Sequence, residues 1–161
     1  MLKLFRAVRR NNRRVQWEKL GYSAGAAKAS ELTAKAFKLK AWKVRIGWDP
    51  TYRTGLKRAR YERLLNYARK HYPTPKWRKG RFDCENQRKH AMSALEKTWN
   101  IFSKGEEQLL IGYVNFLPIG LEMHQAYYVI DDKDNALIIE SSDQRIKDIY
   151  SKGDFREAGG A

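Results

Sequence analysis

The sequence predicts an α+β fold in which a helix that carries Cys84 packs on a small antiparallel sheet, preceded by a basic helical N-terminal extension. Apolar residues three to four positions apart predict the helix, from Cys84 to about Trp99, with Asp83 as its N-cap. Apolar segments predict the strands of the sheet, over residues 109–116, 124–130 and 136–141. The polar run 131–135 between the last two segments has the composition of a hairpin turn.

The other elements follow from shorter patterns. Residues 24–39 are rich in Ala and Lys and favour a helix by propensity. Residues 41–48 alternate, with Trp42, Val44, Ile46 and Trp48 on one side, which predicts a half-buried strand. A stripe of apolar residues predicts a helix over 55–72, and the segment after Asp143 is expected to hold a short helix at most.

The length of 161 residues predicts one domain with an extension. We expect a basic helical arm over residues 1–40 and an α+β domain over residues 41–161. No apolar run approaches the roughly 20 residues that span a bilayer, and residues 1–10 lack the apolar stretch of a secretory signal. A single cysteine excludes an internal disulfide, so we expect the protein to be cytoplasmic or to lie within a virion.

The net charge of +15 is unevenly distributed along the chain. Residues 1–82 hold 24 Lys or Arg and 4 Asp or Glu, a net charge of +20, whereas residues 83–161 hold 9 and 14, a net charge of −5. Such an excess predicts a polyanionic partner, because each phosphate that is neutralised releases counterions. Nucleic acid is the expected partner, and a larger protein assembly or an anionic membrane surface that meets residues 2–8 are alternatives.

The residues expected to bind the polyanion lie in the arm, in the predicted helix 55–72 and in the loop before Cys84. They are Arg9, Arg10, Arg13, Arg14, Lys57, Arg58, Arg60, Arg63, Lys76, Arg78, Lys79 and Arg81. Tryptophan and tyrosine are interleaved with these cations, at Trp17, Trp42, Trp48, Trp77, Tyr52, Tyr61, Tyr67 and Tyr72. Such rings can stack on bases, or they can belong to the core.

Cys84 is the candidate nucleophile, because a thiol in the first turn of a helix is favoured as a thiolate. A cysteine hydrolase also needs an imidazole and a third group that orients it. His124 and Glu140 suit these roles. Their numbers sum to 264 across a hairpin centred near Asp132 or Lys133, and both are even, so they should project from the same face of the sheet.

Three short segments carry a resemblance to known families: Phe82-Asp83-Cys84-Glu85-Asn86 at a helix start, the strand from His124 to Ile130, and the strand that ends at Glu140. Together they resemble the transglutaminase-like and papain-like cysteine hydrolases, nearest to the Cys-His-Glu protease domain of fungal chimerolectins. The resemblance covers roughly residues 40 to 145, and it implies Cys84 as nucleophile, His124 as general base and Glu140 as orienting carboxylate.

The chain departs from those families in two places. Residues 77–81 lack the glutamine that papain-like enzymes place before the nucleophile for the oxyanion hole. The acids that follow the cysteine in the chimerolectin help to bind calcium, whereas here Glu85 is followed by Asn86, Gln87 and Arg88, so we expect no metal. The sequence also has no P-loop, no Gly-rich dinucleotide turn and no HExxH motif, and we expect no cofactor.

The sequence therefore predicts a cysteine hydrolase, a peptidase or amidase, docked through its basic N-terminal half to a polyanion or a larger assembly. The alternative is a non-catalytic basic component of a nucleoprotein assembly, a virion or ribosome-like particle, that retains a hydrolase-like fold. In that case Cys84 would be a small buried hydrophobic residue, and His124 and Glu140 would be ordinary residues of a sheet.

Overall fold

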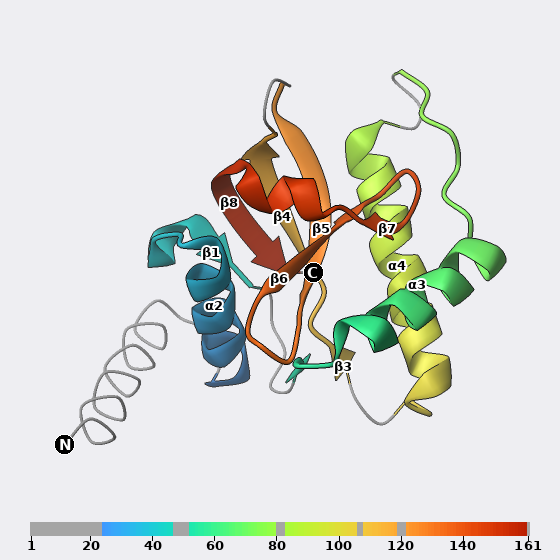
Figure 1. The fold of residues 1–161 in the computed structure, drawn as a ribbon, viewed down its shortest axis with the longest axis horizontal. Helices are drawn as coiled ribbons and strands as arrows, with labels where there is room; N and C mark the ends of the chain where they lie inside the picture. Colours follow the sequence, from blue (N-terminus) through green and yellow to red (C-terminus); the bar gives the residue numbers. More distant parts are fainter. Residues whose placement is uncertain (1–23, 47–51, 80–82, 106–107, 119–121, 161) are drawn as a thin grey trace.

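A six-stranded mixed sheet forms the centre of the computed structural model, which describes residues 24–46, 52–79, 83–105, 108–118 and 122–160 (Figure 1). Across the sheet the order is β1 (Val44–Arg45), β8 (Asp154–Gly160), β4 (Gly112–Leu117), β5 (His124–Ile130), β6 (Ala136–Glu140) and β7 (Arg145–Ile146). All neighbours are antiparallel except β1 and β8, which are parallel. A separate parallel pair joins β2 (Tyr52–Arg53) to β3 (Gln108–Leu109).

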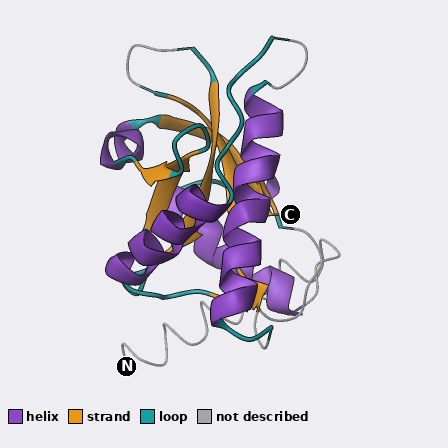
Figure 2. Ribbon diagram, turned by 90° about the vertical axis from the view of Figure 1, so that its right-hand side faces the viewer, coloured by secondary structure: helices purple, strands orange, loops and turns teal. Residues whose placement is uncertain are grey.

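Helices cover both faces of this sheet. Helix α2 (Ala24–Phe37) lies on one face, and α3 (Arg58–His71) and α4 (Cys84–Phe102) lie on the other (Figures 1 and 2). Two short 3-10 helices lie in the connections: η1 (Ala41–Lys43) leads from α2 to β1, and η2 (Asp148–Lys152) leads from β7 to β8. The predicted α+β class is confirmed at this level.

The buried strand β5 divides the core into two clusters. Tyr127 and Val129 face α3 and α4, whereas Tyr128 faces α2. In the α2 layer the Tyr128 hydroxyl is 2.7 Å from the Thr33 hydroxyl, and the Phe37 ring meets the Tyr128 ring edge-on at 4.8 Å between centroids. Successive residues of a strand point to opposite faces, so this alternation attaches helices to both sides of one strand.

The two helices on the α3 face follow their sequence patterns. Helix α4 begins at Cys84, and the Asp83 side chain accepts a hydrogen bond from the Asn86 backbone N–H at 3.1 Å, which confirms the predicted helix start and N-cap. Helix α3 buries one stripe against the sheet and α4, formed by Tyr61, Leu64, Leu65 and Ala68. These positions recur with the helical period, as predicted.

The predicted strand over residues 41–48 is mostly wrong. Residues Ala41–Lys43 form η1, and β1 contains only Val44 and Arg45. The 3-10 turn breaks the alternation, so Val44 and Ile46 are buried while Trp42 is 66% exposed. Trp48 lies outside the described residues.

The C-terminal segment was expected to be a loop with a short helix, and the structure corrects this. Besides η2, it forms β7 and β8, and β8 lies inside the sheet between β1 and β4. A Cβ at Gly159 would meet the Tyr113 ring at 2.6 Å and the Arg45 carbonyl oxygen at 2.7 Å. Gly159 is therefore needed for close packing between strands.

The structure describes only part of the predicted basic arm over residues 1–40. Residues 1–23, with Arg9, Arg10, Arg13 and Arg14, lie outside the described residues. Ala29 and Phe37 of α2 belong to the core cluster, and the division of the chain after residue 40 stays a prediction.

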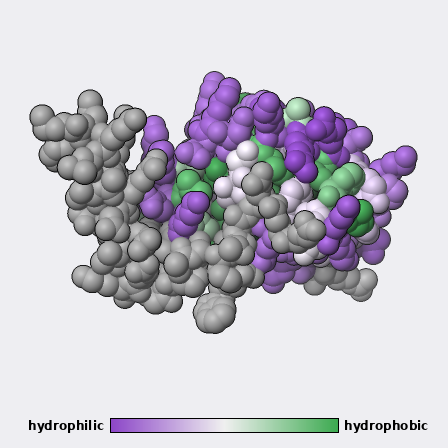
Figure 3. Space-filling model, turned by 90° about the horizontal axis from the view of Figure 1, so that it is seen from below, coloured by the Kyte–Doolittle hydropathy of each residue, from purple (hydrophilic) through white to green (hydrophobic). Residues whose placement is uncertain are grey.

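Among the helices described, none is long and apolar enough to cross a membrane. Seen from below, the described surface is largely hydrophilic, with hydrophobic residues in separate small areas (Figure 3).

The Tyr128 ring closely approaches Gly112, and this predicts a measurable stability effect. A Cβ at Gly112 would overlap the Tyr128 ring, which is fully buried. Gly112→Ala should lower the free energy of unfolding by about 1–3 kcal/mol, because the core cannot accept the added methyl without displacing the ring. Urea denaturation measures this loss.

Gly160 is the matched control, since it pairs with Gly112 across β4 and β8. A Cβ there would come no closer than 3.3 Å to the Ile46 side chain. Equal losses for Gly112→Ala and Gly160→Ala would contradict the proposed clash with Tyr128.

Candidate functional site

Cys84 is exposed at the start of α4. The neighbouring Glu85 pairs with Lys89 one turn further on, at 2.7 Å. The Arg88 guanidinium donates a hydrogen bond to the Gln125 side chain at 2.6 Å, which holds the first turns of α4 beside the start of β5. Among the described residues, however, no hydrogen bond joins the Cys84 thiol to the His124 ring.

His124 and Glu140 do meet, as the hairpin register predicts. Tyr127 of β5 pairs with Ile139 of β6, so residues whose numbers sum to 266 lie opposite one another and His124 is one diagonal step from Glu140. His124 Nε2 is 2.7 Å from Glu140 Oε2. Their side chains are 25% and 13% exposed, so the pair lies just below the surface.

The third member of this cluster, Tyr150, was not predicted from the sequence. The Tyr150 hydroxyl donates to Glu140 Oε2 at 2.6 Å. Its ring also packs edge-on against His124 and Phe116, at 5.6 Å and 5.1 Å between centroids. Tyr150 lies in η2, far from β5 along the chain, and no pattern in the sequence marks that contact.

These contacts give Glu140 an unusual acidity. Burial raises the pKa of a carboxyl, but the hydrogen bonds from His124 and Tyr150 outweigh this effect and hold the pKa of Glu140 at about 2. Burial, and then the hydrogen bond to Glu140, raise the pKa of the Tyr150 hydroxyl above its ordinary value. Glu140 is therefore a stable anion whose accepting oxygen already serves two side chains.

Seven of the residues predicted to bind a polyanion are described, and all seven are exposed: Lys57, Arg58, Arg60, Arg63, Lys76, Arg78 and Lys79. The structure divides them into two groups. The first four belong to α3 and its N-cap, and the others to the loop that leads from the end of α3 to the start of α4 (Figure 1). Arg81 lies outside the described residues.

Some cations near α3 already have partners. Arg58 forms a two-point ion pair with Asp148, at 2.6 Å and 3.0 Å, and also binds Glu62 at 3.0 Å. These hydrogen bonds raise the pKa of Arg58 and lower that of Asp148. Of the seven predicted cations, the remaining six have no ion pair within the described part of the chain.

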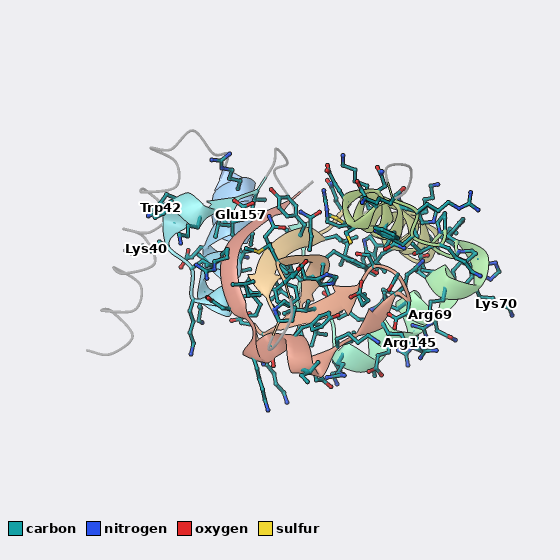
Figure 4. The ribbon with its side chains drawn as sticks, turned by 90° about the horizontal axis from the view of Figure 1, so that it is seen from above. Lys40, Trp42, Arg69, Lys70, Arg145 and Glu157 are labelled. Atoms are coloured by element: carbon teal, nitrogen blue, oxygen red, sulfur yellow. The ribbon has the colours of Figure 1, made fainter. Side chains whose placement is uncertain are left out.

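The C-terminal end of α3 holds further cations that were not among the residues predicted to bind the polyanion. Arg69 donates to the Gln144 carbonyl oxygen at 2.9 Å, and burial and the nearby Arg145 lower its pKa. Figure 4 places Arg69 beside Arg145, with Lys70 pointing away from the molecule at the end of the helix. Lys40 and Trp42 lie at the opposite side of the structure (Figure 4).

The described residues contain no group of three or more His, Cys, Asp or Glu side chains placed to hold a metal ion. Apart from the His124–Glu140 pair, the ion pairs between described residues join side chains that are at least one third exposed. Such pairs contribute little to stability, about 0–1 kcal/mol each.

The fold is similar to two solved structures. One is Polyporus squamosus lectin bound to the human-type influenza-binding epitope Neu5Aca2-6Galb1-4GlcNAc, with 12% identity, a TM-score of 0.55 and coverage of 81% of this chain and 46% of that chain. The other is PSL1a in complex with E64, with 12% identity, a TM-score of 0.58 and coverage of 84% and 50%. No family model and no curated protein matches this chain.

These comparisons correct the predicted family. One neighbour is described as a lectin and neither as a papain-like or transglutaminase-like protease, so the predicted resemblance and the predicted cysteine hydrolase activity are wrong. The alternative, a nucleoprotein component with a hydrolase-like fold, gains no support from them. The structure agrees with this correction, because among the described residues the Cys84 thiol has no hydrogen bond to the His124 ring. The chain spans about half the length of the matched structures, and at 12% identity the likeness concerns the fold alone.

The acidity of Glu140 predicts how stability depends on pH. Its pKa in the folded state, about 2, lies below the ordinary value near 4.5, so its contribution is complete above about pH 4.5 and is lost as the pH falls towards 2. Glu140→Gln should therefore lower the free energy of unfolding at neutral pH, by up to about 3 kcal/mol. The difference from the wild type should shrink at low pH, as measured by urea denaturation at several pH values.

Glu122→Gln is the control, because Glu122 is an exposed carboxyl with no hydrogen bond among the described residues. Tyr150→Phe removes one donor to Glu140 and should give a smaller loss with the same pH dependence. A pH-independent loss in Glu140→Gln would contradict the interpretation.

Proposed function

We propose that this protein binds an anionic polymer through the outer surface of α3. The observation that carries the proposal is the charge of this helix, whose 14 residues contain five Lys or Arg and one Asp or Glu. The single acid, Glu62, is paired with Arg58. The other exposed cations of α3 thus have no carboxylate to neutralise them among the described residues.

The spacing of these cations suits an extended ligand. Arg60, Arg63 and Lys70 are separated by three and seven residues, so they lie along one stripe of the helix, away from the buried stripe that contains Leu64. A rise of 1.5 Å per residue gives this stripe a length of about 15 Å. A polymer with closely spaced phosphates or sulfates can contact several such cations at once.

The positive charges at the start of α3 are electrostatically unfavourable for the helix itself. Arg58 and Arg60 lie in the first turn, which has no acidic residue, and cations there oppose the helix dipole. Arg58 is compensated by Asp148, whereas Arg60 lies over the Trp99 ring at 5.5 Å. An anionic ligand would stabilise this end of the helix, which supports the proposal.

Substitution of the cations near the start of α3 tests the proposal. The triple variant Lys57→Ala, Arg60→Ala, Arg63→Ala should bind a fluorescein-labelled oligonucleotide or heparin about tenfold or more weakly at low salt, because up to three charge contacts are lost. The slope of log affinity against log salt should fall in magnitude by roughly two to three for DNA. Fluorescence anisotropy over a salt series measures both quantities.

The matched control removes three exposed cations from α2 and the segment that follows it: Lys28→Ala, Lys35→Ala, Lys40→Ala. This variant has the same net charge as the α3 variant, so it separates a specific surface from general attraction. Equal losses in the two triple variants would contradict the assignment to α3. Binding that does not change with salt would contradict the polyanion itself.

Carbohydrate binding is a second candidate, favoured by the description of the matched structures. Polyporus squamosus lectin is bound there to the sialylated epitope Neu5Aca2-6Galb1-4GlcNAc. If this chain binds that trisaccharide, isothermal titration calorimetry should give saturable heat with it and less with the uncharged Galb1-4GlcNAc. Absence of heat with both sugars at millimolar concentration would reject this candidate.

A further inference from the structure

Three aromatic rings form a continuous cluster where α3 meets the C-terminal end of α4. The rings of Tyr67 and His71 are stacked, with centroids 4.0 Å apart and planes 28° apart. The Phe102 ring meets Tyr67 edge-on, with centroids 5.4 Å apart. Tyr67 is thus the middle ring, and His71 and Phe102 are the two ends of the cluster.

This ring cluster is not part of the protein core. His71 is exposed, Tyr67 is half-buried, and Phe102 remains 52% exposed. The core on this side of the sheet is formed by other residues, including Leu64 and Leu95. The packing of α3 on α4 therefore does not account for the exposed faces of these rings.

The cluster lies on the same side of α3 as the cations of the proposed binding surface. Arg63 precedes Tyr67 by four residues and Lys70 follows it by three, so both flank the ring on the helix surface. On α4, the Lys97 ammonium lies 5.6 Å from the centroid of the Tyr72 ring. None of these three cations has an ion pair with a described residue.

We infer that the ring cluster of Tyr67, His71 and Phe102, with Arg63, Lys70 and Lys97, binds single-stranded nucleic acid by stacking bases on its exposed rings. The inference rests on the proposed function, because it names the polymer that the basic surface of α3 receives. Aromatic faces bind bases of any sequence, while nearby cations neutralise the backbone. This combination of exposed rings and unpaired cations is the chemistry of a stacking platform.

A single strand fits these observations better than a duplex. The bases of a duplex are already stacked on one another, so a ring on a convex helix surface could reach them only after they are unstacked. A sulfated glycan would use the cations but has no base to stack on His71 or Phe102. The exposed rings therefore select for a strand with free bases.

The test compares two oligonucleotides that differ only in their bases. Oligothymidylate and an abasic oligodeoxynucleotide of the same length, both labelled with fluorescein, are titrated with the full chain by anisotropy at one fixed salt concentration. Because both carry the same backbone charge, a preference for oligothymidylate reports stacking. We expect the wild type to prefer oligothymidylate at least about fivefold.

Phe102→Ala and His71→Ala should each reduce that preference towards one and leave the affinity for the abasic strand nearly unchanged. Phe102→Tyr keeps a ring and should retain the preference. Ile101→Ala is the matched control, since Ile101 is as exposed as Phe102, at 52%, but has no ring. Circular dichroism melts of each variant confirm that the fold is intact.

The outcomes separate this inference from the proposed function. Equal, salt-dependent affinity for the two oligonucleotides would overturn base stacking and leave polyanion binding in place. A preference that survives in both Phe102→Ala and His71→Ala would overturn the assignment to this cluster. Binding of heparin without binding of either oligonucleotide would reject nucleic acid, and failure to bind any of the three would overturn the proposed function together with the inference.

Discussion

The register of the β5–β6 hairpin is the constraint on which the rest of the structure depends. The Asp131 carboxylate accepts hydrogen bonds from the backbone N–H groups of Lys133 and Asn135, both at 2.9 Å, and Asp134 adopts a positive φ of 62°. This turn fixes the pairing of Tyr127 with Ile139. A slip of one residue would turn every side chain of a strand to the other face, and neither helical layer could then pack on β5.

The same register explains which parts of the fold could be predicted from the sequence. The pairing of His124 with Glu140 and the start of α4 at Cys84 depend on local signals, namely a turn with a defined centre and the Asp83 side chain that caps the helix. The position of β8 depends on β1 and β4, which are distant in the chain, so its own sequence, which ends in Gly159 and Gly160, did not reveal it. Tyr150 was missed for the same reason, because only tertiary packing brings it to Glu140.

The candidate nucleophile shows how a correct local prediction can lead to a wrong function. Cys84 does stand at a capped helix start, and His124 does meet a carboxylate, yet each observation is compatible with a structural role. Nε2 of His124 faces Glu140, whose accepting oxygen is shared with Tyr150, so the three side chains join β5, β6 and η2 in one hydrogen-bonded unit. The pH dependence of Glu140 would measure the contribution of this unit to stability.

The cations of α3 differ from this unit in how the fold uses them. Arg58 and Arg69 have partners that attach α3 to η2 and to the segment before β7, and their charges are therefore committed to the fold. Arg63 and Lys70 have no ion pair among the described residues and flank a ring, Tyr67, that stacks on His71 instead of entering the core. Repulsion among such cations lowers stability, and exposed rings gain little from the hydrophobic effect. Because both features cost the folded chain free energy, and both lie on one surface, a ligand with negative charge and flat apolar faces is the simplest physical reason for the two to occur together.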